Sequence, residues 1–423
     1  MNHFELKGGE LHCEDVPLAK IAEAVGTPVY VYSSATLERH FTVLRDALVR
    51  AGLKDPLIAF AVKANSNIAV LRTLANVGAG ADVVSEGEIR RALAAGVPAD
   101  RIVFSGVGKS EAEIAFALET GVSEINLESE PELHLVNKVA QRMGVRAAVA
   151  IRVNPDVEAG GHAKISTGKA ENKFGVSMAE AERLYANAAN MAGVRPVGVA
   201  CHIGSQITDL GPLEAAFRKM RALVERLRAE GLGVERLDLG GGLGVPYFNQ
   251  PTPPEPSEYA SMIARVMGGM TDVQFAFEPG RMIAANAGVL VSRVLHVNAR
   301  PEGRKFLVLD AAMNDLLRPA MYDAYHDIRP LKPRGGEPVV YDVVGPICET
   351  GDTFTRDRSL PPLAAGDLVA FMSAGAYGAA MSSEYNSRLL APEVLVKGSE
   401  YAVVRPRPSY DDMLARERAA PWL

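Results

Sequence analysis

Eight short apolar segments recur between residues 56 and 281, and this repetition is the feature that most constrains the fold. Each segment ends in polar or glycine residues, and a stretch that can hold a helix separates it from the next. The segments are residues 56–65, 81–85, 101–106, 124–129, 147–155, 198–206, 236–242 and 274–281. Helical periodicity that ends near a glycine is found in the intervening runs 86–95, 111–120 and 130–143. A strand and a helix repeated eight times predict an α/β fold, the (β/α)8 TIM barrel.

Alternation within the segments predicts which side chains face the inside of this barrel. Successive residues of a strand point to opposite faces of the sheet. In the last segment Phe275 and Phe277 share one face, and Ala276 and Glu278 share the other. The apolar face is suited to packing on helices, and the other face carries small residues that end in a polar one. We therefore expect the polar ends to meet at the C-terminal mouth of the barrel, where this fold places its chemistry.

The character of the sequence changes after Arg281. Strand-like runs with turn residues between them follow at 289–297, 305–309, 337–344, 367–373 and 393–396. These runs predict a second, β-rich domain, completed by the N-terminal residues. The expected division is a barrel over residues 34–283 and a β-rich domain formed by residues 1–33 and 284–423.

Composition narrows the class of protein. The formal net charge is −6 and the pI is about 5.9, which argues against binding to nucleic acid or to an anionic membrane. The N-terminus lacks the pattern of a signal peptide and no apolar run has membrane-spanning length, so a cytoplasmic protein is expected. The three cysteines, Cys13, Cys201 and Cys348, are far apart and predict neither a disulfide framework nor a metal site.

Lys63 stands at the end of the first apolar segment. If the strand continues to this point, Lys63 shares a face with Ala59 and Ala61 and lies over an empty space. A desolvated lysine has a lowered pKa and readily forms a Schiff base with a carbonyl compound. The alternative is a lysine at a strand end that extends into solvent.

Two further motifs follow the seventh and eighth segments. The glycine run 240–244 allows backbone amides to approach an anion, and barrels of this kind commonly bind phosphate after strands seven and eight. A tight turn between strand and helix is the alternative. Glu278, at the barrel mouth, could pair with Arg281 or could face a pyridine nitrogen and keep it protonated.

His202 and Ser205 belong to the sixth segment and complete the set. His202 points to the interior side and could stack on a planar ring, whereas most single histidines have a structural role. Ser205 offers a hydroxyl to phosphate. Together with Lys63, the glycines and Glu278, these residues indicate a pyridoxal 5'-phosphate site on a barrel.

Nine motifs, in order along nearly the whole chain, resemble the diaminopimelate decarboxylases, a family of the fold-type III, alanine-racemase-like group. They are AVKANS (61–66), DVVSEGE (82–88), ENKFG (171–175), HIGSQ (202–206), GGGLG (240–244), EPGR (278–281), LLRPAMY (316–322), CETGD (348–352) and GAY (375–377). The resemblance implies that Lys63 carries the cofactor, that His202 stacks on it and that Glu278 contacts the ring nitrogen. It also implies that the phosphate end is held by Ser205, Gly241, Gly242, Pro279, Gly280, Arg281 and Tyr377.

The resemblance further implies the substrate and the assembly. Cys348 corresponds to the proton donor, which reaches the site from the other subunit of a homodimer with shared active sites. The distal end of the substrate is bound at positions that match Arg281, Arg318, Tyr322, Glu349 and Tyr377. The implied reaction is decarboxylation of meso-2,6-diaminopimelate to L-lysine and CO2, with residues 159–175 as a lid over the site.

Three alternative functions fit these residues less well. A decarboxylase of ornithine, arginine or carboxynorspermidine would give Arg281 and Arg318 less to bind, because those substrates lack a second α-amino-carboxylate. An alanine racemase tends to set an arginine against the pyridine nitrogen, where this chain has Glu278. A non-catalytic cofactor carrier or inactive homologue would lack the second domain, the lysine or the cysteine, whereas Lys63 and Cys348 are both present.

Overall fold

The computed structural model describes residues 2–158, 172–247 and 251–423. The chain divides into two compact units. The barrel unit comprises Glu38–Pro246 and Pro251–Ile283, and the sheet unit comprises Met1–Leu37, Tyr247–Gln250 and Ala284–Leu423. Each is described by itself below.

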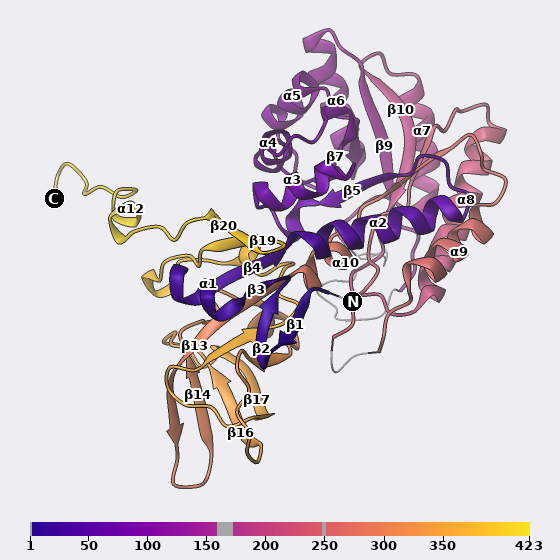
Figure 1. The fold of residues 1–423 in the computed structure, drawn as a ribbon. Helices are drawn as coiled ribbons and strands as arrows, with labels where there is room; N and C mark the ends of the chain where they lie inside the picture. Colours follow the sequence, from indigo (N-terminus) through magenta and orange to yellow (C-terminus); the bar gives the residue numbers. More distant parts are fainter. Residues whose placement is uncertain (1, 159–171, 248–250) are drawn as a thin grey trace. The chain divides into compact units, whose positions relative to one another are not determined.

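Eight parallel strands close the barrel unit, in the order β10-β11-β12-β5-β6-β7-β8-β9. Each of the eight apolar segments overlaps one of them, although β6 and β10 begin before their segments, so the predicted TIM barrel is confirmed (Figure 1). The strands are β5 (Leu57–Ala61), β6 (Gly80–Val83), β7 (Ile102–Phe104), β8 (Glu124–Leu127), β9 (Ala147–Val153), β10 (Val194–Cys201), β11 (Arg236–Asp238) and β12 (Gln274–Phe277).

Helices form the outer layer of the barrel (Figure 1). They include α2 (Ser34–Arg50), α3 (Ile68–Asn76), α4 (Glu86–Ala94), α5 (Glu111–Thr120), α6 (Glu130–Met143), α7 (Met178–Ala189), α8 (Leu210–Ala229), α9 (Pro256–Met267) and α10 (Arg281–Ala284). The three expected helical runs correspond to α4, α5 and α6. Helix α5 begins with a capping box between Ser110 and Glu113 and ends at Gly121, whose φ of 78° is left-handed.

The predicted alternation of faces is confirmed in β12. Ala276 belongs to an interior cluster with Leu57, Ala59 and Val103. The neighbouring Phe277 points outward, with its ring centroid 6.3 Å from that of Tyr259 in α9. Small residues inside and large residues outside leave the polar residue after each strand at the mouth of the barrel.

One local prediction is wrong. Strand β5 ends at Ala61, whose N–H donates to the carbonyl of Pro279 at 3.1 Å, and residues Val62–Ala64 form a 3-10 helix. Lys63 therefore lies in a turn after the strand and not on the face of Ala59. The sequence is apolar through Val62, but the strand ends one residue earlier, at Ala61, which donates to Pro279.

The sheet unit contains a nine-stranded mixed sheet and a small sheet, β1-β2-β3. Its bounds are β1 (Phe4–Lys7), β2 (Glu10–Cys13), β3 (Val16–Pro17), β4 (Val29–Ser33), β13 (Gly288–Ala299), β14 (Lys305–Leu309), β15 (Ile328–Pro330), β16 (Val339–Val344), β17 (Thr353–Leu360), β18 (Leu368–Phe371), β19 (Glu393–Lys397) and β20 (Glu400–Arg405). Its helices are α1 (Leu18–Val25), α11 (Arg318–Tyr322) and α12 (Tyr410–Leu414). The N-terminal strand β4 lies between β13 and β19.

The five predicted strand-like runs correspond to β13, β14, β16, β18 and β19. Strand β17 was not predicted, because its sequence TFTRDRSL is largely polar and carries charges where an apolar run would be expected. It pairs with β16 in antiparallel orientation. Among the described residues, no helix is long and apolar enough to cross a membrane.

Gly198 allows β10 and β11 to approach each other, and this closeness gives the first prediction. A Cβ atom at Gly198 would overlap the carbonyl oxygen of Arg236 in the neighbouring strand. Gly198→Ala should therefore lower the free energy of unfolding by about 1–3 kcal/mol, measured by denaturant titration. Gly108→Ala is the control, since a Cβ at Gly108 meets nothing within 4 Å. Equal stability of the two variants would contradict the prediction.

Candidate active site

Polar side chains and glycines lie at or just beyond the carboxyl ends of the barrel strands, which all lie at the same end of a parallel barrel. In the barrel order from β10 to β8 they are His202 and Ser205, Gly240–Gly242, Glu278 and Arg281, Lys63, Asp82, Ser105, and Asn126. The barrel thus brings together the barrel residues predicted from the sequence. Asp82, Ser105 and Asn126 were not predicted as members.

Lys63 faces a buried carboxylate. Its Nζ lies 2.7 Å from Oδ2 of Asp82, whose side chain is fully buried, while the Lys63 side chain is 42% exposed. Lys63 is therefore an ion-paired amine at the mouth, a contact that was not predicted from the sequence. The other Asp82 oxygen, Oδ1, is buried without a hydrogen-bond partner among the described residues. Register would have identified this pair, because Asp82 lies opposite Ala61 between β5 and β6.

Glu278 accepts a hydrogen bond from Oγ of Ser105 at 3.2 Å, and Nδ2 of Asn126 lies 3.5 Å from the same oxygen. Removal from water raises the pKa of Glu278 well above its ordinary value, and the negative charges of Asp238 and Asp82 raise it further. A raised pKa means that the carboxyl group holds a proton more tightly, so a proton is kept at this position. This property suits the predicted contact with a ring nitrogen.

His202 is a neutral imidazole. Burial lowers its pKa well below the usual value, and the positive charges of Arg152 and Lys63 act in the same direction. The N–H of Gly241 donates to Nδ1 of His202 at 3.2 Å, which places the ring proton on Nε2. A neutral ring held by the backbone can stack on another planar ring without adding charge to the site.

The glycine run forms a tight turn between neighbouring strand ends. Gly240 and Gly242 have φ values of 66° and 111°, and a Cβ on Gly241 would overlap the carbonyl oxygen of Glu278. The N–H of Gly240 donates to Oδ1 of Asp238 at 2.7 Å. Two of the three glycine amides, those of Gly240 and Gly241, thus bind protein groups, and the turn holds the His202 ring and the backbone N–H of Glu278.

Arg281 and Ser205 place a cation and a hydroxyl side by side. Nη2 and Nε of Arg281 lie 3.0 and 3.2 Å from Oγ of Ser205, and Arg281 is 6% exposed. A guanidinium and a hydroxyl are donors that a phosphate group accepts from. With the Lys63 amine and the Glu278 carboxyl on the same rim, this donor set fits pyridoxal phosphate.

Two linked ion pairs near the carboxyl ends of β7, β8 and β9 were not predicted. Nη1 of Arg152 lies 2.7 Å from Oε1 of Glu128, and Nζ of the buried Lys109 lies 2.9 Å from Oε1 of Glu132. Oε2 of Glu132 accepts from the N–H of Glu128 at 2.6 Å and joins the two pairs. These ion pairs hold the Arg152 charge close enough to lower the pKa of His202 and that of Glu278.

The other predicted residues belong to the sheet unit. Arg318 is buried, and its Nη1 donates to Nε2 of His326 at 2.9 Å, while Nδ1 of His326 donates to the carbonyl of Met372. The guanidinium also lies 5.4 Å from the ring centre of Tyr247. Tyr322 follows four residues later on the same short helix, α11.

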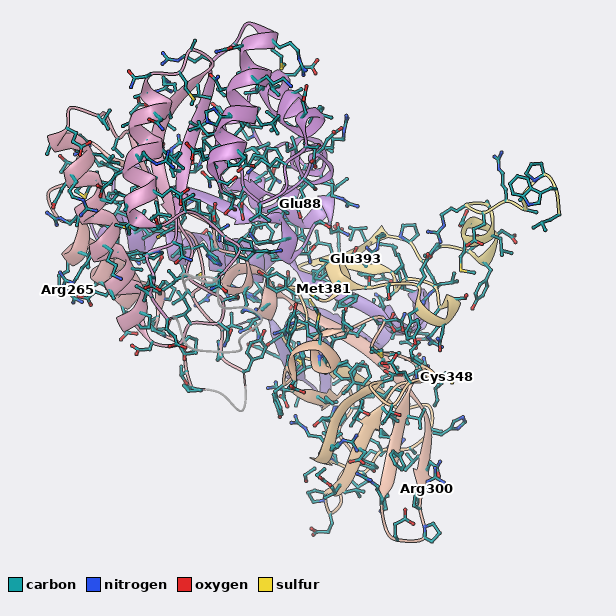
Figure 2. The ribbon with its side chains drawn as sticks, turned by 180° about the vertical axis from the view of Figure 1, so that it is seen from behind. Glu88, Arg265, Arg300, Cys348, Met381 and Glu393 are labelled. Atoms are coloured by element: carbon teal, nitrogen blue, oxygen red, sulfur yellow. The ribbon has the colours of Figure 1, made fainter. Side chains whose placement is uncertain are left out.

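Cys348 is exposed at the surface of the sheet unit (Figure 2), and Glu349 follows it in the loop between β16 and β17. Tyr377 follows β18 and has a left-handed φ of 57°. The predicted lid extends over 159–175, of which residues 159–171 lie outside the described residues. Among the described residues, no group of three or more histidine, cysteine or acidic side chains could hold a metal ion.

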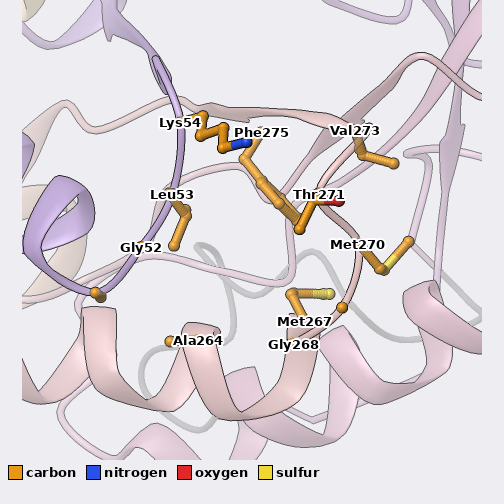
Figure 3. A pocket seen from close by; sticks show the side chains of 12 residues that line it. Gly52, Leu53, Lys54, Ala264, Met267, Gly268, Met270, Thr271, Val273 and Phe275 are labelled. Carbon is orange, nitrogen blue, oxygen red and sulfur yellow. The ribbon is translucent and has the colours of Figure 1, made fainter.

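A pocket at the opposite end of the barrel has a different character (Figure 3). It lies before β5 and β12 and is lined by residues that include Leu53, Met267, Met270 and Phe275. Lys54 is the only charged side chain among the described residues that line it. Its lining lacks the paired acids and bases of the barrel mouth.

Comparison with known proteins identifies the family. Residues 34–285 match the model of the pyridoxal-dependent decarboxylase, pyridoxal binding domain. The chain belongs to the pyridoxal-dependent decarboxylases. It is 49% identical to a diaminopimelate decarboxylase from Zymomonas mobilis, with 99% of each chain covered, and 48% identical to one from Vibrio cholerae, with 100% of each covered. The solved diaminopimelate decarboxylase from M. jannaschii in complex with L-lysine has a TM-score of 0.95 at 37% identity and covers 100% of both chains.

The buried acids of the decarboxylase barrel predict a pH dependence of stability. Burial raises the pKa of Glu124 from its usual 4.5 to about 7, although Nη1 of Arg236 lies 3.1 Å away. The folded chain therefore binds this proton more tightly than the unfolded chain. The stability that results is fully present below pH 4.5 and is lost as the pH rises towards 7.

Glu124→Gln removes this titration. The free energy of unfolding of the variant, measured relative to wild type, should rise by about 3 kcal/mol between about pH 4.5 and pH 8. Glu235→Gln removes a more exposed, ion-paired carboxylate and serves as the control, with a change of less than about 1 kcal/mol expected. If the difference in unfolding free energy from wild type changes equally with pH for both variants, Glu124 does not ionise in this pH range.

Proposed function

We propose that the protein decarboxylates meso-2,6-diaminopimelate to L-lysine and CO2 with pyridoxal phosphate, as a cytoplasmic enzyme of lysine biosynthesis. The observation that carries the proposal is the convergence of Lys63, His202 and Glu278 at one end of the barrel. Full-length relatives that are named diaminopimelate decarboxylases support the choice of substrate.

The barrel residues would hold the cofactor. Lys63 would bind its aldehyde carbon, Glu278 would hold the proton at the ring nitrogen, and His202 would stack on the ring. The phosphate would be bound by Ser205, Gly241, Gly242, Pro279, Gly280, Arg281 and Tyr377. When bound, pyridoxal phosphate withdraws the electron pair that remains after CO2 leaves. Asp82 keeps the Lys63 amine at the mouth before the cofactor arrives.

The sheet unit supplies the remaining chemistry. The Cys348 thiol would give a proton to the carbon that loses its carboxylate, and water would later restore that proton. The distal end of diaminopimelate carries a carboxylate and an ammonium. Arg318 and Arg281 would bind the carboxylate with Tyr322 and Tyr377 beside it, and Glu349 would bind the ammonium. His326 holds the Arg318 guanidinium in place before substrate binds.

A substrate panel tests this assignment. CO2 release should be found with meso-diaminopimelate, should be weaker by roughly a hundredfold or more in kcat/KM with ornithine or D-lysine, and should be absent in Lys63→Ala. Arg318→Ala should raise KM for diaminopimelate by roughly 10- to 100-fold, since it removes a charge-assisted contact. Arg329→Ala removes a more exposed arginine of the same unit and should leave KM unchanged. Comparable rates with ornithine would move the chain to the decarboxylases of basic amino acids.

We further infer that the enzyme is a homodimer in which each active site takes Lys63 from one subunit and Cys348 from the other. The exposure of Cys348 on its own subunit supports this arrangement, because a proton donor must be shielded from water when it acts.

Mixing two inactive variants tests the shared site. A heterodimer of Lys63→Ala and Cys348→Ala contains one site with both residues intact, so exchange of subunits should restore up to about a quarter of wild-type activity. The double variant Lys63→Ala/Cys348→Ala mixed with wild type is the control for exchange itself. If mass spectrometry detects heterodimers and no activity returns, the two residues do not act across subunits.

A further inference from the structure

A turn far along the chain holds the backbone of Cys348. The N–H of Cys348 donates to Oδ1 of Asn386 at 3.0 Å, across 38 residues of sequence. Asn386 lies in the short 3-10 segment Tyr385–Ser387 with a left-handed φ of 56° and ψ of 27°. Asparagine tolerates this conformation better than most residues, so the turn presents the Asn386 side chain without great strain.

The same turn also contacts the residue after Cys348. The hydroxyl of Tyr385 hydrogen-bonds with the carboxylate of Glu349, and this bond raises the pKa of Tyr385. Two neighbouring residues of the turn, Tyr385 and Asn386, thus contact two neighbouring residues of the loop.

The two residues just before the turn, Ser383 and Glu384, are themselves held in place. The N–H of Ser383 donates to the carbonyl of Asn314 at 2.9 Å, and Nδ2 of Asn314 donates to the carbonyl of Ser383 at 3.1 Å. Glu384 forms an ion pair with Arg416 of the C-terminal segment at 2.6 Å. A turn that is held in this way can serve as a fixed support for a surface loop.

Asp352 holds the inner side of the Cys348 loop. Its buried carboxylate accepts from the N–H of Ile347 and from the N–H of Met313, both at 2.7 Å. These bonds end one residue before Cys348. The backbone N–H of Cys348 itself donates to Asn386, which thus ties the exposed tip of the loop to a segment outside the loop.

We propose that Asn386 is a positioning residue that sets the place of the Cys348 thiol. The inference rests on the proposed role of Cys348 as proton donor. A proton donor works only within hydrogen-bond reach of the receiving atom, and a small displacement is costly. Loss of the Asn386 contact should therefore lower kcat and leave KM little changed.

Asn386→Gly tests this contact, because glycine keeps the left-handed backbone and removes only the acceptor. The Cys348 amide should exchange its hydrogen roughly fivefold or more faster than in wild type, and kcat for diaminopimelate should fall roughly tenfold with KM little changed. Asn386→Asp retains an acceptor oxygen and should keep the amide protected. Ser387→Gly is the matched control: its φ is 55° in the same turn, and it leaves Asn386 in place.

A role of Asn386 in folding alone would lower the stability of Asn386→Gly without separating KM from kcat.

Three outcomes would overturn the proposal. The first is a Cys348 amide that is unprotected in wild-type protein, a measurement that needs no variant to fold. The second is Ser387→Gly behaving like Asn386→Gly, and the third is protection lost in Asn386→Gly with kcat unchanged. If wild-type protein releases no CO2 from diaminopimelate, the proposed function fails, while amide exchange still decides whether Asn386 holds Cys348.

Discussion

Closure of eight parallel strands is the constraint on which the rest of the site depends. Because every strand of the barrel runs in the same direction, the residue that follows each strand lies on one rim. Short side chains inside, such as Ala59 and Ala276, let the strands close, and Gly198 lets β10 meet β11. Residues separated by more than two hundred positions, such as Lys63 and Glu278, therefore belong to the same rim without any direct bond being needed to bring them there.

Charge balance on this rim then sets what each residue can do. Asp82 holds the Lys63 amine as an ion pair, and burial, with the acids around Glu278, raises the pKa of its carboxyl group. On the other side, Arg152 is kept by Glu128 and lowers the pKa of His202. Acidic neighbours thus help Glu278 to keep a proton, and a basic neighbour helps the His202 ring to remain neutral.

The sequence allowed much of this to be predicted, for identifiable reasons. The eight strands and the inner and outer faces follow from local periodicity, which a barrel preserves. The strand carrying Lys63 was predicted too long, because its end depends on a backbone bond to Pro279. The polar strand β17 was missed, because its pairing with β16 and not its own composition makes it a strand. Asp82 stood inside a recognised motif, but its role depends on the register between β5 and β6.

Residues that hold other functional residues in place were the hardest to predict. Lys63 and Glu278 have unusual chemistry for their place in the sequence, so type and spacing point to them, whereas Cys348 was indicated only by the resemblance of its motif to the family. Asn386 contacts Cys348 and His326 contacts Arg318 through a hydrogen bond, and such a bond leaves no local pattern. An asparagine in a left-handed turn is ordinary in a sequence. Only the fold, which places that turn against the Cys348 loop, makes its side-chain oxygen the acceptor of the Cys348 N–H.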